Sequence, residues 1–202
     1  MKIQPLEPGM FYHIYNRGNN GINLFYDTDC YYHFLRLYEK YMEPVAETYA
    51  WCLLGNHFHL LVYVKAEDEI DTSKLEYSTV EKPKIVNASK QFSHLFNAYT
   101  QAINKRFKRT GSLFEKPFHR KLVSSDDYFQ KLIYYIHNNP VYHGFCEDIN
   151  EYPWSSYGSI VSEKPTQIKR KEVIDAFYGL DNFIAYHNQN QNLFDIDNLI
   201  IE

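Results

Sequence analysis

Two histidines lie one residue apart in the segment GNHFHLLVYV, which starts at Gly55. The residues around them are apolar and partly β-branched, which predicts a strand over 57–64. Alternate residues of a strand share a face, so His57 and His59 point to one side while Phe58 points to the other. Two imidazoles placed in this way can hold one divalent metal ion and leave positions open for oxygen ligands, as a catalytic metal requires. A pair of hydrogen-bonded sheet histidines without a metal is the simpler alternative.

A second candidate group lies in a helix predicted over 124–139. Its buried stripe is predicted from apolar residues at i, i+3, i+4 and i+7, namely Phe129, Leu132, Ile133 and Ile136. At about 100° per residue, Tyr135 and Asn139 lie one turn apart on a flank of that stripe. The neighbouring pair, Tyr134 and Asn138, is expected on the opposite, solvent side. We therefore expect Tyr135 and Asn139 to border a cleft over the sheet, with a half-buried tyrosine and a helix-terminal asparagine as the alternative.

Charge is strongly segregated, although the formal net charge is only −4. Residues 66–82 carry six carboxylates against two lysines, whereas residues 105–121 carry seven Lys or Arg against Glu115. The basic segment also contains three phenylalanines and His119, a combination that suits a phosphate backbone and stacked bases. A solvated helix end followed by a turn is the alternative interpretation of the basic segment.

The surrounding sequence predicts the elements that must position these groups. Three strands are expected at 11–17, 48–54 and 57–64, the last two as a hairpin. Helices are expected at 27–42, capped by Asp27 or Asp29, and at 84–108. A fourth strand is expected within 111–123, restricted by Pro117 to an edge or a bulge.

The helix 124–139 is expected to end before Pro140, and a short helix near 171–178 precedes a polar tail. The resulting order, β-α-β-β-α-β-α, predicts an α+β fold close to the ferredoxin-like type, an antiparallel sheet with helices on one side. We expect one domain over 1–160, with an acidic insertion at about 66–83, and a helical or polar extension over 161–202.

Composition excludes several classes of protein. With 202 residues, 45% of them apolar, the chain is long enough for a globular core and does not have the composition of a disordered protein. No apolar run approaches the roughly 20 residues of a membrane span, and the N-terminal residues lack the pattern of a secretory signal. Three cysteines without CxxC spacing argue against a disulfide framework or a zinc ribbon. We expect a cytoplasmic protein with reduced thiols and no membrane partner.

Five separated motifs together resemble the single-tyrosine HUH transposases, and within them the REP-associated branch. GNHFHLLV is similar to their His-hydrophobic-His motif, and YYIHNNPVYHGF to their catalytic-tyrosine helix, which in that branch runs into Asn-Pro-Val. FYHIYNRG, GSLFEKPFHRK and EYPWSSY resemble further motifs of that branch and occur in the expected order. The resemblance covers roughly residues 10–160.

The resemblance implies a ferredoxin-like HUH endonuclease domain that cleaves and rejoins single-stranded DNA at hairpin-bearing sites. It implies His57 and His59 as ligands of Mg²⁺ or Mn²⁺ and Tyr135 as the nucleophile that forms a 5′-phosphotyrosine. Asn139 matches the third ligand, although the better-known branch has Gln there. Lys131, on the flank of Tyr135, is a candidate base or orienting residue. The resemblance is compatible with either a homodimer or a monomer.

DNA phosphate contacts are expected from the basic segment, namely Arg106, Lys108, Arg109, Arg120 and Lys121, and from Arg17 near the end of a predicted strand. Phe118 and Trp154 are expected either to stack on bases or to belong to the core. A domesticated DNA-binding protein of the same fold that no longer cleaves is the main alternative. A barrel-type metal hydrolase is disfavoured because the chain lacks βα repeats, and a pure interaction module would leave the charge segregation unexplained.

Overall fold

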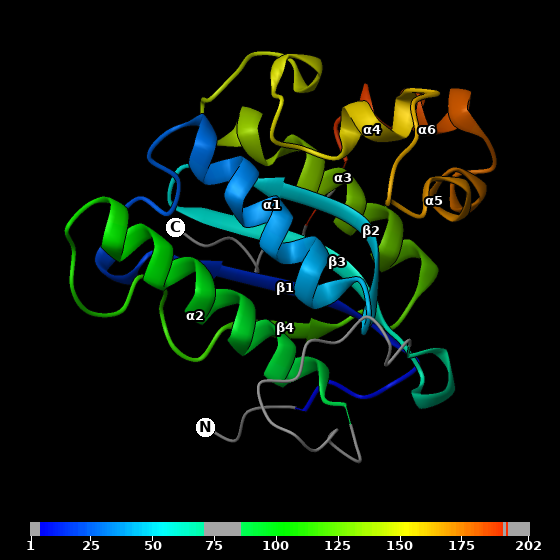
Figure 1. Cartoon of the computed structure of the whole chain (residues 1–202). Coiled ribbons are helices and arrows are strands. Elements are labelled where there is room, and N and C mark those ends of the chain that lie inside the picture. The colour runs from blue at the N-terminus through cyan, green and yellow to red at the C-terminus, as the bar shows by residue number, and fades with distance from the viewer. Residues whose placement is uncertain (1–4, 71–85, 192, 194–202) are drawn as a thin grey trace.

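A four-stranded antiparallel sheet in the order β2-β3-β1-β4 forms the centre of the computed structural model, which describes residues 5–70, 86–191 and 193 (Figure 1). Its strands are β1 (Met10–Arg17), β2 (Ala46–Leu53), β3 (His57–Val64) and β4 (His119–Leu122). The main helices are α1 (Thr28–Met42), α2 (Ala88–Arg106) and α3 (Asp126–Tyr142). This strand order and the two β-α-β connections confirm the predicted ferredoxin-like α+β fold.

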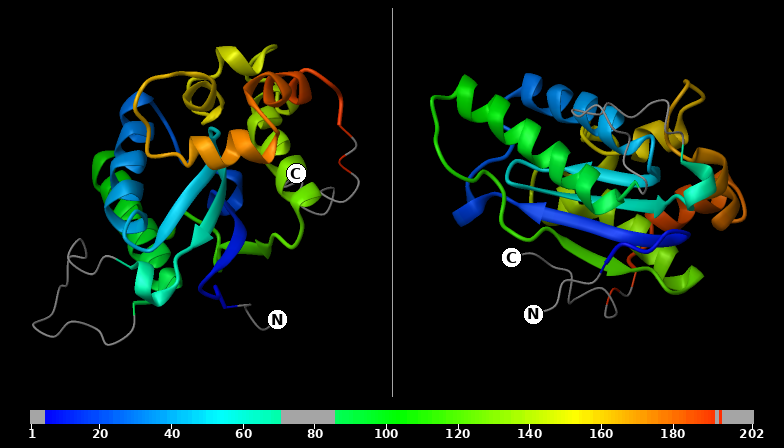
Figure 2. Two further views of the ribbon diagram at one scale, coloured as in Figure 1. Left: turned by 90° about the vertical axis from the view of Figure 1, so that its right-hand side faces the viewer. Right: turned by 60° about the horizontal axis from the view of Figure 1, so that its bottom comes forward.

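The helices cover both faces of the sheet, so the expectation that they lie on one side was wrong. Helices α1 and α2 lie on one face, and α3 lies on the other (Figure 2, left). The reason is visible in β3, where every residue except Tyr63 is buried, on both faces of the strand. A strand that buries both of its faces needs a packed layer on each side.

The ends of the helices follow local hydrogen bonding. Asp27, one of the two expected caps, accepts a hydrogen bond from the backbone N–H of Cys30 at 3.1 Å and starts α1. Helix α3 starts at the N-cap Ser125 but does not stop before Pro140, as we expected, because it continues to Tyr142. A proline so close to a helix end removes a single N–H donor. The next turn still closes, because His143 N–H donates to the carbonyl of Asn139 at 3.0 Å.

The C-terminal part of the described chain packs against α3 and the outer edge of β2. It contains four short helical segments, η4 (Ile149–Glu151), α4 (Tyr157–Val161), α5 (Arg170–Ala176) and α6 (Leu180–His187). Bridges from Thr48 to Ile168 and from Cys52 to Ser155 cover the β2 edge, which would otherwise be free to pair with another chain. Helix α6 occupies part of the region that we expected to be a polar tail. It forms there because Phe183 and His187, one turn apart, are both buried.

This C-terminal packing corrects a second expectation about α3. Tyr134 and Asn138 do not face solvent, since they are 3% and 8% exposed. The ring of Tyr134 lies 5.9 Å from that of Tyr186 and 5.7 Å from that of His187, so α6 covers the side of α3 that we expected to face solvent.

Two apolar cores result, one on each face of the sheet. The second core contains residues from both sides of position 160, including Ile133, Ile136, Ile160 and Phe183. The domain boundary expected at 160 falls inside α4 and stays a prediction. Most of the acidic insertion lies outside the described residues, apart from the short helix η2 (Glu67–Glu69). Within the described part of the chain, no helix combines the length and the apolar character needed to cross a bilayer.

Candidate functional site

The register of β1 and β3 gathers polar side chains on the face of the sheet that α3 covers. Tyr15 pairs with His59, and Arg17 pairs with His57. Paired residues share a face, so these side chains and His13 all point toward α3. His57 and His59 are 4% and 0% exposed, which places both imidazoles inside the protein.

Helix α3 brings the two predicted residues of its flank to these histidines. The ring of Tyr135 stands edge-on to that of His59, with 5.3 Å between centroids and 82° between planes. Asn139 Oδ1 lies 3.3 Å from His57 Nε2. The structure therefore brings together Tyr135, Asn139, His57 and His59, although they come from segments about 80 residues apart in the sequence.

The hydrogen bonds around His57 and Asn139 leave the lone pairs of His57 Nε2 and Asn139 Oδ1 facing each other. Asn56 Oδ1 lies 2.7 Å from His57 Nδ1, and an amide oxygen only accepts, so Nδ1 carries the proton of a neutral imidazole. The Asn139 amide donates its Nδ2 to the carbonyl of Tyr135 at 3.5 Å, which turns its oxygen toward His57. The unprotonated Nε2 and this oxygen then converge without a proton between them. Their separation of 3.3 Å is close to the roughly 3 Å between adjacent ligands of an octahedral divalent ion.

His59 offers a further free nitrogen at the same place. Its Nδ1 is hydrogen-bonded to His13 Nε2 at 2.9 Å, whereas its Nε2 is buried and has no hydrogen-bond partner. Buried polar atoms are rarely left unpaired, and such an atom calls for a water, an ion or a functional role. Two imidazole nitrogens and one amide oxygen thus form a donor set that suits a divalent cation and leaves open positions.

Burial keeps these imidazoles neutral, as metal ligands must be. Desolvation lowers the pKa of His57 to about 4 and that of His13 to about 3. Desolvation also lowers the pKa of His59 well below 6.5, with further contributions from the neighbouring His13 and His57. No larger cluster competes with this set, because the described residues contain no group of three or more His, Cys, Asp or Glu that could hold a metal.

Tyr135 is a protonated phenol in this environment. Burial raises its pKa above 10.0, and the hydrogen bond with Asn139 offsets only part of this effect. A phenol of this kind needs a nearby cation or base before it can attack. Lys131, the candidate base, lies one turn before Tyr135 and forms an ion pair with Asp127 at 2.8 Å. Its role stays a prediction.

Several of the expected DNA-binding cations are already engaged within the protein. Arg17 pairs with Glu115 at 2.7 Å, and the guanidinium of Arg109 donates to Asn104 Oδ1 at 2.8 Å. Arg120 donates to Ser89 Oγ at 2.9 Å. Lys121 Nζ lies 5.0 Å from the ring centre of Tyr128, and Lys108 is exposed.

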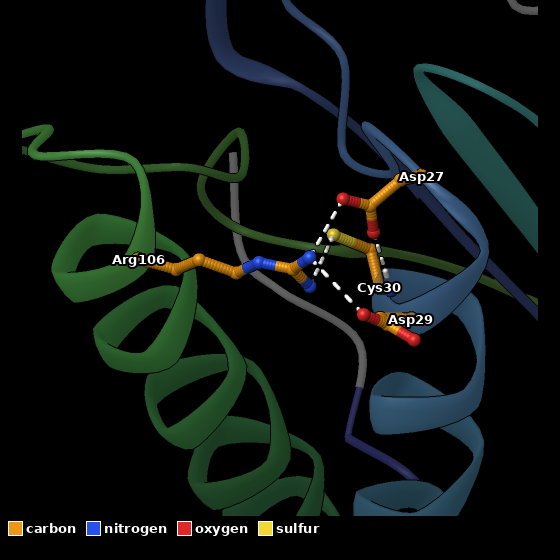
Figure 3. A network of polar contacts seen from close by, with 4 residues as sticks. All are labelled: Asp27, Asp29, Cys30 and Arg106. Carbon is orange, nitrogen blue, oxygen red and sulfur yellow. Dashed lines mark hydrogen bonds and ion pairs between the residues drawn. The ribbon is translucent and has the colours of Figure 1, made fainter.

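Arg106 is held in a network that joins the end of α2 to the start of α1 (Figure 3). Its guanidinium contacts Asp27 at 2.8 Å, Asp29 at 3.2 Å and the sulfur of Cys30 at 3.9 Å. The two carboxylates partly neutralise the positive charge of the guanidinium, so its attraction to a DNA phosphate is weaker. Its predicted role in DNA binding is untested, and the network gives it a second role as a clamp between helices.

The two aromatic residues considered for base stacking pack against other side chains of the protein, Phe118 as a buried residue and Trp154 as a partly buried one. Phe118 is 8% exposed, and the guanidinium of Arg120 covers its ring at 3.9 Å. Trp154 stacks on Tyr31 with 4.4 Å between centroids. These contacts favour the core alternative for both residues.

Sequence reasoning missed two histidines of the site, His13 and His143. His143 is exposed at the end of α3, and its ring lies 4.7 Å from that of His57. It follows Asn139 by one helical turn, so the spacing Tyr135, Asn139, His143 was a signal that helix periodicity contained. His13 was harder to find, because only the pairing of β1 with β3 places it beside His59.

Comparison with known proteins supports the resemblance seen in the sequence. No protein-family model matches the chain. A Haemophilus influenzae protein named "Putative REP-associated tyrosine transposase" is 27% identical over 134 residues, which span 65% of this chain and 71% of the relative. A solved structure of a REP-associated tyrosine transposase bound to a REP hairpin covers 82% of this chain and 87% of its own, at 18% identity and a TM-score of 0.58. The chain is thus similar in sequence to a protein named as a REP-associated tyrosine transposase, and similar in fold to a solved one.

Proposed function

We propose that this protein is a metal-dependent endonuclease that cleaves and rejoins single-stranded DNA at hairpin-bearing sites through a 5′-phosphotyrosine at Tyr135. The observation that carries the proposal is the placement of Tyr135 and Asn139, one turn apart on α3, directly over His57 and His59. A hairpin substrate is proposed because the solved relative binds a REP hairpin.

In this reaction the Tyr135 oxygen attacks the scissile phosphorus while the bond from phosphorus to the 3′ oxygen breaks. The phenol loses its proton, the departing strand leaves as a 3′-hydroxyl, and the 5′ phosphate stays on Tyr135 as an ester. Attack of a 3′-hydroxyl on this ester reverses the step and rejoins DNA. The burial of Tyr135, which is 3% exposed, keeps bulk water away from the ester until a strand returns.

His57, His59 and Asn139 would hold the metal ion through His57 Nε2, His59 Nε2 and Asn139 Oδ1. A bound Mg²⁺ or Mn²⁺ supplies Lewis-acid polarisation of a phosphoryl oxygen and offsets the negative charge that develops there. The chain contributes position, since Asn139 is a rigid helical residue whose amide is turned by the Tyr135 carbonyl. Lys131, paired with Asp127 as an ammonium, cannot accept a proton, so we propose the orienting role for it.

DNA contacts are proposed along the basic segment and the adjoining groove. A cavity of about 700 Å³ lies between α2 and residues 111–118, and its lining includes Asn16, Asn97, Lys116 and Arg120. Asn16 points to the face of the sheet opposite that of Arg17 and His57, so this cavity lies on the α2 side and not on the catalytic face. A DNA strand that leaves the metal ligands would have to pass the end of β1 at Arg17 to reach these amide and cationic groups, which suit bases and phosphates.

The second candidate function is a DNA-binding relative that does not cleave. It is favoured by the ion pairs of Arg17, opposite His57 in the sheet, and of Lys131, one turn before Tyr135, because both cations are already engaged. Intact His57, His59 and Tyr135 favour cleavage instead.

A cleavage assay separates the two functions. The full chain is incubated with Mn²⁺ and a mixed library of hairpin-bearing single-stranded oligonucleotides, and products are analysed on a denaturing gel and by intact-protein mass. We expect a covalent protein–DNA adduct that is absent in Tyr135→Phe.

Tyr134→Phe is the matched control for this assay. Tyr134 neighbours the nucleophile, but its hydroxyl accepts from Tyr142 Oη at 3.4 Å on the side of α3 that α6 covers. The adduct should persist in this variant. Hairpin binding without an adduct, with Mn²⁺ present, would instead support the DNA-binding relative.

A further inference from the structure

A third buried histidine, His13 on β1, is hydrogen-bonded to the candidate metal ligand His59, and among the described residues its ring has no other hydrogen-bond partner. His13 Nε2 lies 2.9 Å from His59 Nδ1, and both side chains are 0% exposed. The remaining nitrogens, His13 Nδ1 and His59 Nε2, have no partner. His13 belongs to neither the proposed ligand set nor the nucleophile.

One proton is shared between the two facing nitrogens, and its position decides what His59 can do. If it sits on His59 Nδ1, then His59 donates to His13, and His59 Nε2 keeps a free lone pair. If it sits on His13 Nε2, then His59 accepts the hydrogen bond and carries its own proton on Nε2, which blocks a metal. With one proton on each imidazole, these are the two arrangements that the 2.9 Å contact allows.

We propose that His13 is a positioning residue that holds His59 in the tautomer whose Nε2 is free to bind a metal ion. The inference rests on the proposed function, because it concerns the same metal site. Ligating histidines commonly donate their second ring N–H to an oxygen acceptor, and here the imidazole of His13 takes that place. Its ring is fixed for this task, since it stacks on Tyr15 with 4.7 Å between centroids and lies within 20° of the plane of the His59 ring to which it is hydrogen-bonded.

The metal-binding arrangement also reduces the number of unpaired buried atoms. Without a metal, His59 Nε2 and His13 Nδ1 are both unpaired. A metal on His59 Nε2 leaves His13 Nδ1 as the single unpaired nitrogen. The pair of histidines is thus more favourable with a bound ion than without one.

The first test measures Mn²⁺ affinity of the full chain by isothermal titration calorimetry, in the absence of DNA. In His13→Phe the ring and its stacking remain, but the acceptor is lost, and we expect the affinity to fall about 10- to 100-fold. In His13→Gln the side-chain carbonyl restores an acceptor, and we expect the affinity within about 3-fold of the natural chain. Tyr15→Phe, which keeps the aromatic stack, is the matched control and should bind Mn²⁺ as the natural chain does.

The second test uses the natural sequence, so it does not depend on how a variant folds. In protein labelled with ¹⁵N-histidine and loaded with Zn²⁺ as a diamagnetic probe, long-range ¹H–¹⁵N spectra report which ring nitrogens carry protons. We expect protons on His59 Nδ1 and His13 Nδ1. A proton on His13 Nε2 in the loaded protein, or a folded His13→Phe with unchanged Mn²⁺ affinity, would overturn the inference.

These outcomes separate this inference from the proposed function. A chain that binds Mn²⁺ and forms the Tyr135 adduct, with unchanged affinity in His13→Phe, loses only the role of His13. A chain that binds no Mn²⁺ loses both. Metal binding that depends on His13 without any adduct supports this inference and contradicts the proposed cleavage.

Discussion

Two clusters of buried histidines lie on opposite sides of α3, and their hydrogen bonds differ. On the sheet side are His13, His57 and His59; on the side of α6 are His137 and His187. Burial lowers the pKa of every one of these five imidazoles, so neither burial nor pKa distinguishes the clusters.

The cluster near α6 is fully satisfied. His187 Nδ1 donates to the carbonyl of Phe183 at 2.8 Å, which leaves its Nε2 to accept from His137 Nδ1 at 2.9 Å. His137 Nε2 then accepts from the Ser156 hydroxyl at 2.8 Å, and Ser156 Oγ accepts from the backbone N–H of Trp51 at 2.9 Å. The carbonyl of Phe183 therefore fixes the donor and the acceptor in each of these hydrogen bonds, and both imidazoles are neutral.

The sheet cluster is left incomplete. His13 Nδ1 and His59 Nε2 have no partner, and His57 Nε2 faces the oxygen of Asn139. The two clusters are equally buried, and they differ in whether every ring nitrogen has a hydrogen-bond partner. Unpaired nitrogens, rather than burial, therefore separate a candidate site from a structural histidine cluster. The satisfied cluster attaches the C-terminal helices to α3, while the incomplete one is available for a ligand.

The largest expected effect comes from removing a ligand of the incomplete cluster. In His57→Leu we expect cleavage to fall about 1,000-fold, because a metal contributes several kcal/mol to such a reaction. The free energy of unfolding without metal should change by no more than about 1 kcal/mol, since an apolar side chain replaces a nitrogen that faces another acceptor. Adduct formation rates and urea unfolding measure the two effects. A folded His57→Leu variant with normal cleavage would show that the incompletely hydrogen-bonded cluster is not needed for the reaction.

Breaking the fully hydrogen-bonded cluster of His137 and His187 should lower the free energy of unfolding and leave metal binding unchanged. Ser156→Ala leaves His137 Nε2 and the Trp51 N–H unpaired inside the protein, and we expect a loss of about 3 kcal/mol in unfolding free energy. Mn²⁺ affinity should not change. The matched control is Ser155→Ala, which removes one weaker contact to Tyr157 N at 3.3 Å and should cost about 1 kcal/mol. If Ser156→Ala weakened Mn²⁺ binding as His57→Leu does, the two clusters would not be independent.

Metal should stabilise the fold through one cluster alone. At a concentration 100 times its Kd, Mn²⁺ is expected to add about 2.7 kcal/mol to the free energy of unfolding. The increase should vanish in His57→Leu and persist in Ser156→Ala, as read from urea unfolding with and without metal. An equal increase in His57→Leu would place the binding site elsewhere.

The smallest of the four main effects is expected from acid, which should lower the free energy of unfolding through His187. Desolvation lowers the pKa of His187 from 6.5 to about 4. Between these values the unfolded chain binds a proton that the folded chain does not, so stability falls as pH drops below 6.5. The share of His187 is about 2 kcal/mol at pH 5, measured as the difference in unfolding free energy between the natural chain and His187→Phe across pH 7 to 5. A difference that does not vary with pH would show that His187 titrates normally in the folded state.

Much of the fold and part of the site could be predicted from local pattern. Strand β3 coincides with the predicted 57–64, and α1 and α2 lie within their predicted ranges, because periodicity and capping are encoded in neighbouring residues. The same periodicity placed Tyr135 and Asn139 on one flank of α3. It erred at Pro140, where a helix end depends on whether the following turn can still close, and that turn involves Gly144 and Phe145 beyond the predicted helix 124–139.

The chemistry of the site was present in the sequence, as an HxH strand and a Tyr–Asn pair at helical spacing. What only the tertiary structure decided was which nitrogen each histidine has free. That depends on the register of β1 against β3, which puts His13 beside His59, and on the docking of α3, which turns Asn139 toward His57. The same packing buried Tyr134 under α6, whereas Tyr135 faces the histidines of the candidate site. Local periodicity determines which side chains share a face, whereas hydrogen bonding between distant segments determines which of them remain available for chemistry.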